Sequence, residues 1–184
     1  MSQARRAVVI VDMLNEFLYG HAEQRLSPVA NVPGLVNNVQ KLIEHARRVN
    51  TPVLFVACAH GEDDPMFRFI PPHALRGTWE AQIIADLAPR QGEAIIAKHT
   101  YDGFHETRLD ATLQELGVSE LILAGVQTDC CVHASGQGAI FRGYRTALVT
   151  ECTDTVSAER QRVGLQRFRA LIGPTLSLDE IPWE

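Results

Sequence analysis

The sequence has no long hydrophobic run and no cluster of basic residues. Its longest apolar stretches include AVVIV (7–11) and PVLFVACA (52–59), whereas a membrane-spanning helix needs roughly 20 apolar residues. The 17 lysines and arginines are outnumbered by 22 acidic residues and are scattered along the chain. Neither a membrane nor a nucleic acid is therefore an expected partner, because nucleic-acid binding depends on clustered positive charge.

Cysteine is scarce, and no export signal is visible. Asp12 lies where a signal peptide would still be apolar, so we expect a cytoplasmic protein. Four cysteines would allow two disulfides. A chain of 184 residues buries enough core without them, and a reducing compartment keeps thiols free. We therefore expect four free thiols.

Internal repeats, low-complexity segments and linkers are also missing from the sequence. Apolar residues make up 46% of the chain and charged residues 21%, which is the composition of an ordinary globular domain. The length fits one domain, which we expect to cover residues 1–184.

Apolar runs alternate with amphipathic stretches along the whole chain. The runs expected to form strands lie at 7–11, 52–57, 93–97, 121–126, 145–150 and 174–178. The expected helices lie at 35–49, 79–87, 107–117, 131–142 and 157–171, with Trp79 facing the core in the second. Strands that are apolar on both faces and alternate with helices indicate parallel βαβ units. The predicted fold is a doubly wound, mainly parallel α/β sheet of about six strands with helices on both faces.

Chemically complementary side chains stand at the ends of three predicted strands. Asp12 follows the first strand, Lys98 ends the third, and Cys130 and Cys131 follow the fourth in the turn TDCC. Ligands of open α/β sheets bind outside the carboxyl ends of the strands. A carboxylate, an amine and a thiol are therefore expected at one edge of the sheet, where the amine would stabilise both other groups. This arrangement predicts a catalytic site.

The two adjacent cysteines come just before a predicted helix. Thr128 or Asp129 would cap this helix, which places Cys130 and Cys131 in its first turn. The free N–H groups and the helix dipole would stabilise a thiolate there and hold an oxyanion, with Asp12 as the base. The alternatives are two unreactive buried cysteines, which is the commoner use of cysteine, and a strained vicinal disulfide.

Four motifs in a fixed order resemble those of the isochorismatase-like cysteine hydrolases, a family that includes nicotinamidases and N-carbamoylsarcosine amidohydrolases. They are VVIVDMLNEF, PPHALRGTWEAQI, KHTYDGFHETRLDATL and LAGVQTDCCV, and they extend over nearly the whole chain. The family pattern G-V-x-T-D-x-C-V selects Cys131 rather than Cys130. The resemblance implies a catalytic triad of Asp12, Lys98 and Cys131 that hydrolyses a C–N bond of a small amide or ureido compound.

The resemblance also implies a mechanism. Cys131 would form a thioester with the substrate, and the backbone N–H groups of Gln127 and Cys131 would form the oxyanion hole. This chemistry needs no organic cofactor. A cis peptide bond between Val126 and Gln127 is a further feature of the family.

Four positions of this chain match positions that line the substrate site in the family. They are Leu14, Phe17, Tyr101 and Phe104. Each of these side chains would fit an ordinary hydrophobic core equally well.

The sequence departs from the family at the metal site of nicotinamidases. Those enzymes carry Asp-x-His and a later His as ligands of a zinc-type ion, whereas this chain has Cys58-Ala59-His60 and then His73. Cysteine and histidine bind zinc, but three ligands without a fourth are a weak metal signal. We therefore expect a pocket without metal, and a divalent ion held by Cys58, His60 and His73 is the alternative.

Two other functions fit parts of the sequence. Isochorismatases of the same family hydrolyse a vinyl ether without a cysteine, and Cys131 argues against that activity. A nucleotide-binding or interaction domain would share the fold. However, the first strand runs into Asp12 and MLNEF, not into the glycine-rich turn of a dinucleotide site.

The longest irregular segment runs from His60 to Gly77. Its centre, PMFRFIPP, carries four large apolar side chains: Met66, Phe67, Phe69 and Ile70. An apolar loop of this kind is either covered by a partner subunit or folded over the site. Because members of the resembling family often form dimers or larger assemblies, we expect a homo-oligomer.

Overall fold

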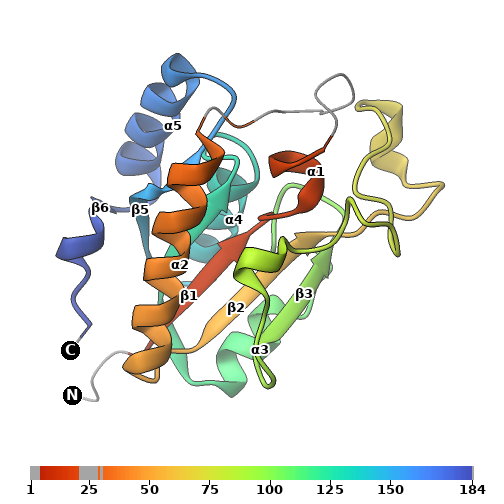
Figure 1. Cartoon of the computed structure of the whole chain (residues 1–184). Helices are drawn as coiled ribbons and strands as arrows, with labels where there is room; N and C mark the ends of the chain where they lie inside the picture. The colour runs from red at the N-terminus through yellow and green to blue at the C-terminus, as the bar shows by residue number, and fades with distance from the viewer. Residues whose placement is uncertain (1–4, 21–28, 30, 184) are drawn as a thin grey trace.

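A computed structural model describes residues 5–20, 29 and 31–183 of the chain. Its six strands are β1 (Arg5–Val11), β2 (Val53–Cys58), β3 (Ala94–Lys98), β4 (Val118–Val126), β5 (Arg145–Asp154) and β6 (Thr175–Leu176). All neighbouring strands pair in parallel in the order β3-β2-β1-β4-β5-β6. The predicted doubly wound, parallel sheet is confirmed (Figure 1).

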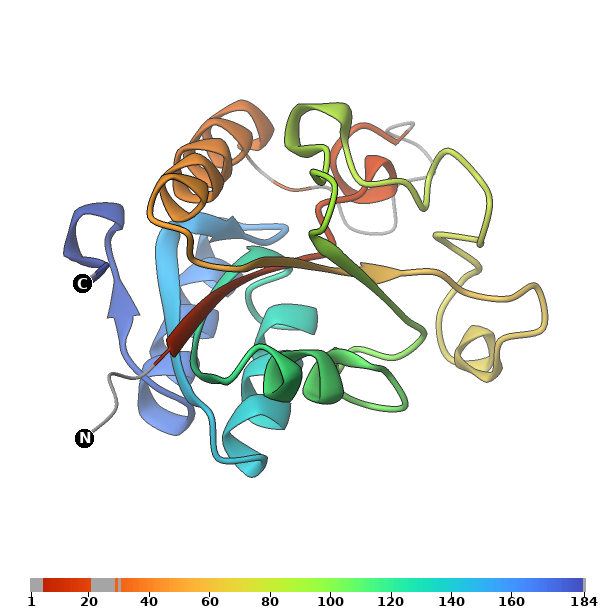
Figure 2. The same cartoon turned by 90° about the horizontal axis from the view of Figure 1, so that it is seen from below.

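Both faces of the sheet are covered by helices. One face carries α1 (Asn15–Leu18) and α2 (Val32–Arg48), and the other carries α3 (Leu109–Glu115), α4 (Cys131–Phe141) and α5 (Ala158–Leu171). Figure 2 shows this layering, with the orange α2 above the sheet and the green, cyan and blue helices below it. Three short 3-10 helices complete the described part of the chain: η1 (Pro65–Arg68), η2 (Ala85–Leu87) and η3 (Leu178–Glu180).

The central strand β1 shows why the strands lack polar alternation. Val8 and Ile10 pack into the core beneath α2, whereas Val9 and Val11 pack into the core beneath α3 and α4. Successive side chains of a strand point to opposite faces. A central strand between two helical layers must therefore be apolar at every position.

Polar side chains begin two of the predicted helices. Asn31 precedes α2 and accepts a hydrogen bond from the N–H of Gly34 at 3.1 Å. Ser157 precedes α5 and accepts one from the N–H of Arg160 at 3.3 Å. Such caps satisfy N–H groups that have no partner within the helix.

The prediction of a helix at 79–87 is wrong. The segment consists of turns followed by η2, and Trp79 is 50% exposed instead of facing the core. Its backbone pairs with the segment after β1, because the N–H of Asn15 donates to the carbonyl of Gln82 at 3.0 Å. Pairing between segments far apart in sequence has outweighed the local helical pattern.

No helix in the described residues is long and apolar enough to cross a membrane.

Candidate active site

Asp12, Lys98 and Cys131 lie together at the carboxyl edge of the sheet. Asp12 directly follows β1, Lys98 is the last residue of β3, and Cys131 is the first residue of α4. The Lys98 Nζ atom lies 2.7 Å from Asp12 Oδ2 and 3.5 Å from Cys131 Sγ. Asp12 and Lys98 are each 1% exposed, so water screens their ion pair very little.

The electrostatics of this group favour an ion pair beside a protonated thiol. Burial acts to lower the pKa of Lys98, but the Asp12 carboxylate and the neighbouring thiols outweigh it and raise the pKa well above its usual value. The pKa of the Cys131 thiol is also raised, chiefly by a hydrogen bond with Cys130 and further by burial. The same bond lowers the pKa of Cys130. The resting site thus holds a cationic Lys98 and a neutral thiol at Cys131.

A second thiol, that of Cys58, belongs to the same group. The N–H of Cys58 donates to Asp12 Oδ1 at 2.8 Å, and its Sγ lies 3.5 Å from Asp12 Oδ2. The ammonium of Lys98 donates to Cys58 Sγ at 2.8 Å. A hydrogen bond with Cys131, burial and the Asp12 carboxylate raise the pKa of the Cys58 thiol. Cys58 therefore contacts all three members of the predicted triad.

The helix start differs from the prediction. Cys130, not Thr128 or Asp129, occupies the N-cap position of α4, and no side chain caps the helix there. The Thr128 hydroxyl instead forms a hydrogen bond with the Thr153 hydroxyl at 2.7 Å, and the Asp129 carboxylate accepts one from Arg160 at 2.6 Å. The two side chains expected to cap the helix therefore bind to residues of β5 and α5 instead. Cys131 still begins the helix, where backbone N–H groups have no intrahelical acceptor.

The backbone before α4 bends around Cys131. The Val126–Gln127 peptide bond is cis, as the resemblance implies. The carbonyl of Gln127 accepts the N–H groups of Cys130 at 3.0 Å and Val132 at 3.1 Å. The two residues that flank Cys131 are therefore fixed to the same carbonyl, which holds the Cys131 backbone in place.

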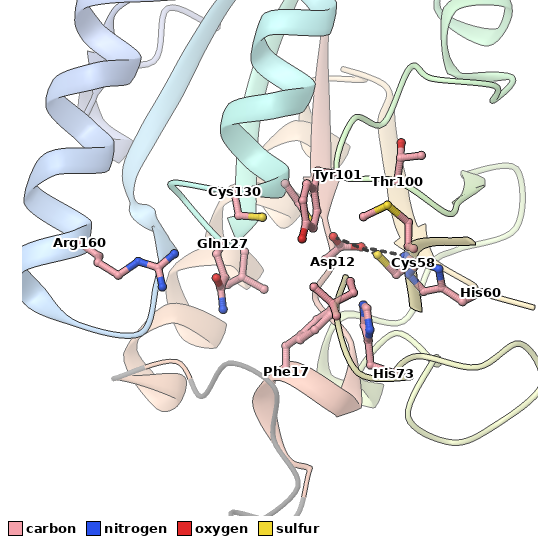
Figure 3. A pocket seen from close by; sticks show the side chains of 14 residues that line it. Asp12, Phe17, Cys58, His60, His73, Thr100, Tyr101, Gln127, Cys130 and Arg160 are labelled. Carbon is pink, nitrogen blue, oxygen red and sulfur yellow. Dashed lines mark hydrogen bonds between the residues drawn. The ribbon is translucent and has the colours of Figure 1, made fainter. Parts of the chain in front are cut away.

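A cavity of about 200 Å³ opens onto this group. Asp12, Cys58, Cys130 and Cys131 line it together with apolar and aromatic side chains. Figure 3 shows the side chains of Asp12, Cys58 and Cys130 around the cavity. Two of the four predicted substrate-lining residues, Phe17 and Tyr101, line the cavity. Gln127, which the resemblance assigns to the oxyanion hole, lines it as well. It is small, since pockets for drug-sized ligands have volumes of about 300–1,000 Å³.

Two predicted substrate-lining residues lie in the core and not on the cavity. Leu14 is fully buried beneath α2 and forms an antiparallel bridge with Ile83. Phe104 is 3% exposed and packs against Tyr144, with the Arg142 guanidinium 5.0 Å from its ring centre.

The isochorismatase domain matches residues 6–180 of this chain. The match includes every element that positions the cavity. The chain belongs to the isochorismatase family. The predicted family membership is therefore confirmed.

Individual members of the isochorismatase family resemble the chain over most of its length. Nicotinamidase 3 of Arabidopsis thaliana is 28% identical over 178 residues, covering 88% of this chain and 79% of that protein. The structure of N-carbamoylsarcosine amidase from Thermoplasma acidophilum has a TM-score of 0.85 and 30% identity, covering 97% and 99% of the two chains. A pyrazinamidase of Pyrococcus horikoshii, solved in complex with zinc, shares the fold at a TM-score of 0.85 and 22% identity, covering 95% and 99%.

Cys58, His60 and His73 form a candidate metal site in this isochorismatase-family chain. Their ligand atoms all lie within 4.8 Å of one another. His60 Nδ1 is bonded to Asp64 at 2.9 Å and His73 Nδ1 to the Pro71 carbonyl at 3.0 Å, which leaves Nε2 of each ring as the ligand atom. Metal-binding imidazoles are usually oriented in this way. The three donors fit a zinc-type ion with an open fourth position.

Some residues that line the cavity were not among the predicted site residues. Arg160 lines the cavity from α5 and pairs with Asp129. No motif marks it, because only the pairing of β5 with β4 brings α5 to the site. Met66 and Ile70 of the apolar loop also line the cavity, so part of that loop folds over the site as one of the two predicted alternatives.

Proposed function

We propose that the protein is a cysteine hydrolase that cleaves a C–N bond of a small amide or ureido compound through a thioester on Cys131. The observation that carries the proposal is the buried group of Asp12, Lys98 and Cys131 at the base of a small cavity. Relatives named for nicotinamide and N-carbamoylsarcosine support a C–N bond as the target.

Acylation would begin with a proton transfer from Cys131 to Asp12. The oxygens of Asp12 and the sulfur of Cys131 lie within 4.8 Å of each other, a separation that substrate binding would shorten. The ammonium of Lys98 faces both groups, so it offsets the charge as it moves from the carboxylate to the sulfur. The thiolate then attacks the carbonyl carbon.

The tetrahedral oxyanion would be held by the backbone N–H groups of Gln127 and Cys131. Donors of this type stabilise a developing negative charge by roughly 3 to 4 kcal/mol each. Collapse of the intermediate breaks the C–N bond, and Asp12 returns its proton to the departing amine. Water then hydrolyses the thioester and restores the thiol of Cys131.

No step of this mechanism passes through a metal, and we keep the expectation that none is required. When bound by Cys58, His60 and His73, a zinc-type ion would act as a Lewis acid beside the substrate. The same histidines would otherwise serve as hydrogen-bonding groups for the substrate.

We also retain a cytoplasmic location and a homo-oligomeric state as parts of the proposal. The four cysteines are free thiols, which is the state expected in a reducing compartment. The outward-facing Phe69 of the apolar loop is 83% exposed, which supports a surface that a second copy covers.

The decisive experiment measures ammonia release from a panel of primary amides, ureido compounds and nicotinamide. We expect turnover of at least one class by the wild type and loss of that turnover in Cys131→Ala. Isochorismate belongs in the same panel. Consumption of isochorismate without ammonia release from any amide would replace the proposal with the vinyl-ether alternative.

A further inference from the structure

Two thiols besides that of Cys131 line the cavity, those of Cys58 and Cys130, whereas amide hydrolysis uses one thiol. Cys58 and Cys131 both line it, and both sulfurs accept from the same ammonium, at 2.8 and 3.5 Å from Lys98 Nζ. Their sulfurs and the nearest Asp12 oxygen all lie within 4.8 Å of one another. The mechanism above gives the Cys58 sulfur no role. Two thiols this close, in a cavity that admits small molecules, form a dithiol centre.

We propose that Cys58 and Cys131 form a peroxide-oxidation site, in which hydrogen peroxide converts the two thiols into a reversible disulfide. The proposal concerns these thiols alone and does not depend on which amide the enzyme hydrolyses. Hydrogen peroxide is smaller than any amide, so the cavity that admits substrate admits it too.

The first step uses the groups that surround Cys131. Asp12 takes the thiol proton, and the thiolate beside Lys98 attacks one peroxide oxygen. The O–O bond breaks, the departing hydroxide takes the proton and leaves as water, and Cys131 becomes a sulfenic acid.

The second step uses Cys58. Its Sγ lies 3.5 Å from Asp12 Oδ2, so the carboxylate can accept its proton while the sulfur attacks the sulfenic sulfur. The S–S bond forms, the S–O bond breaks, and hydroxide leaves with that proton as a second water. In total the two thiols lose two electrons, and one peroxide is reduced to two waters.

Cys130 is the competing thiol, and geometry disfavours it. Adjacent Cα atoms lie 3.8 Å apart across a trans peptide, whereas disulfides usually join Cα atoms about 4.4 to 6.8 Å apart. Cys131 is also fixed in the first turn of α4. Cys152 does not line the cavity and is fully buried, which makes it a suitable control.

The disulfide would protect the nucleophile. A sulfenic acid without a neighbouring thiol is oxidised further to a sulfinic acid, which dithiothreitol does not reduce. With Cys58 beside it, Cys131 is instead held as a disulfide that a thiol reductant reverses. The expected behaviour is complete but reversible loss of activity in peroxide.

The test maps the disulfide in the full-length protein. Native enzyme is treated with hydrogen peroxide, remaining thiols are blocked with N-ethylmaleimide in denaturant, and the unreduced protein is digested with trypsin. Cys58 falls in the peptide 49–68, and Cys131 falls in the peptide 109–142 together with Cys130. We expect these two peptides to be cross-linked in the wild type and equally in Cys130→Ser and Cys152→Ser.

In Cys58→Ser we expect no cross-link, a sulfinic acid on Cys131, and no recovery with dithiothreitol. If that variant does not fold, mapping of the wild type and of Cys130→Ser decides alone. A sulfinic acid on Cys131 beside an alkylated Cys58 in the wild type would overturn the proposal. A cross-link that disappears in Cys130→Ser would do the same. The mapping needs no substrate, so its outcome is separate from that of the amidase test.

Discussion

At the scale of single residues, Lys98 is the residue whose side chain joins the other members of the site. It contacts Asp12, Cys58 and Cys131 while fully buried. Such an ion pair is costly to break, because the remaining charge stays buried without a partner. A substitution at Lys98 should therefore lower stability, because Asp12 loses its partner, and lower turnover, because Cys131 loses the neighbouring ammonium. The two effects can be measured separately.

Replacing Lys98 by Met should lower turnover by roughly 10²- to 10³-fold, the usual cost of removing one preorganised electrostatic group. The same change should destabilise the fold by about 3–5 kcal/mol, because it leaves the Asp12 carboxylate buried and unpaired. Steady-state kinetics and urea denaturation measure the two effects.

The matched control for Lys98→Met is the double variant with Asp12→Asn. Removing both charges should restore most of the lost stability but none of the activity. A Lys98→Met enzyme with turnover near that of the wild type would remove Lys98 from the proposed triad.

An acyl-trapping experiment should show which of the two adjacent thiols, Cys130 or Cys131, is the nucleophile. Because the pKa of Cys130 is lowered, alkylation rates alone do not identify the nucleophile. Incubation with an activated ester and an acid quench should leave an acyl group on Cys131, read by tandem mass spectrometry. Cys131→Ala should lose at least roughly 10⁴-fold in turnover, whereas Cys130→Ala should keep the adduct. An acyl group on Cys130 in the wild type would contradict this assignment.

At the scale of elements, the close approach of β4 to β1 sets the position of Asp12. Gly125 pairs with Val11 and has a φ of 108°. A Cβ at Gly125 would lie 2.0 Å from the carbonyl oxygen of Val11. Only glycine permits this contact. A larger residue would displace the backbone at Val11, which leads directly into Asp12 of the proposed triad.

Gly125→Ala should therefore cost more than Gly143→Ala. Gly143 also has a positive φ, of 87°, but a Cβ there would meet nothing within 4 Å. We expect about 1–3 kcal/mol of backbone strain at Gly143 and a further 1–3 kcal/mol or so of overpacking at Gly125. Chemical denaturation of both variants measures the difference. If the two variants were equally stable, the backbone of β1 could move aside from a Cβ at Gly125 without a loss of free energy, which would contradict this prediction.

An ion pair joins the end of α2 to the start of β3. Arg47 donates twice to Glu93, at 2.7 Å each, and the N–H of Arg90 donates to the same carboxylate at 2.7 Å. Burial acts to raise the pKa of Glu93, but these bonds outweigh it and lower the pKa below its usual value of 4.5. The carboxylate therefore stabilises the fold above pH 4.5, and this contribution is lost as the pH falls through the lowered pKa.

Glu93→Gln should destabilise the protein by about 1.5–3 kcal/mol at pH 7. The difference from the wild type should shrink as the pH falls below 4.5 and through the lowered pKa, because Glu93 then becomes protonated in the wild type as well. Urea denaturation at pH 7 and at an acidic pH below the lowered pKa measures this. The control is Glu159→Gln, whose partner Arg162 lies on the exposed side of α5, and it should leave stability unchanged at both values. A difference at Glu93 that is independent of pH would contradict the charge argument.

At the scale of the whole molecule, we expect a dimer or a larger assembly. Phe69 of the apolar loop is 83% exposed, and Phe141 at the end of α4 is similarly exposed at 79%. Light scattering at micromolar concentration should give a multiple of the 20.4 kDa chain mass. Phe69→Asp should lower that mass, whereas Phe141→Asp is the control and should not, because Phe141 lies outside the apolar loop that we expect a second copy to cover. A monomeric wild type would refute the expectation.

The sequence by itself determined the elements and the chemistry at their ends. Runs that are apolar at every position, such as 7–11 and 121–126, require a strand between two helical layers. Parallel strands all end at the same edge, so Asp12, Lys98 and Cys131 had to lie on one side of the sheet whatever the strand order. That rule depends only on local pattern and chain direction.

Only the tertiary structure decided which of these groups touch. The strand order lays β2 between β3 and β1, which places Cys58 against Asp12 and Lys98 and forms the dithiol centre. Pairing of distant segments also turned 79–87 away from a helix and drew Asp129 to Arg160 instead of to its own helix. Contacts between residues far apart in sequence depend on the order of strands in the sheet, and no local pattern records that order.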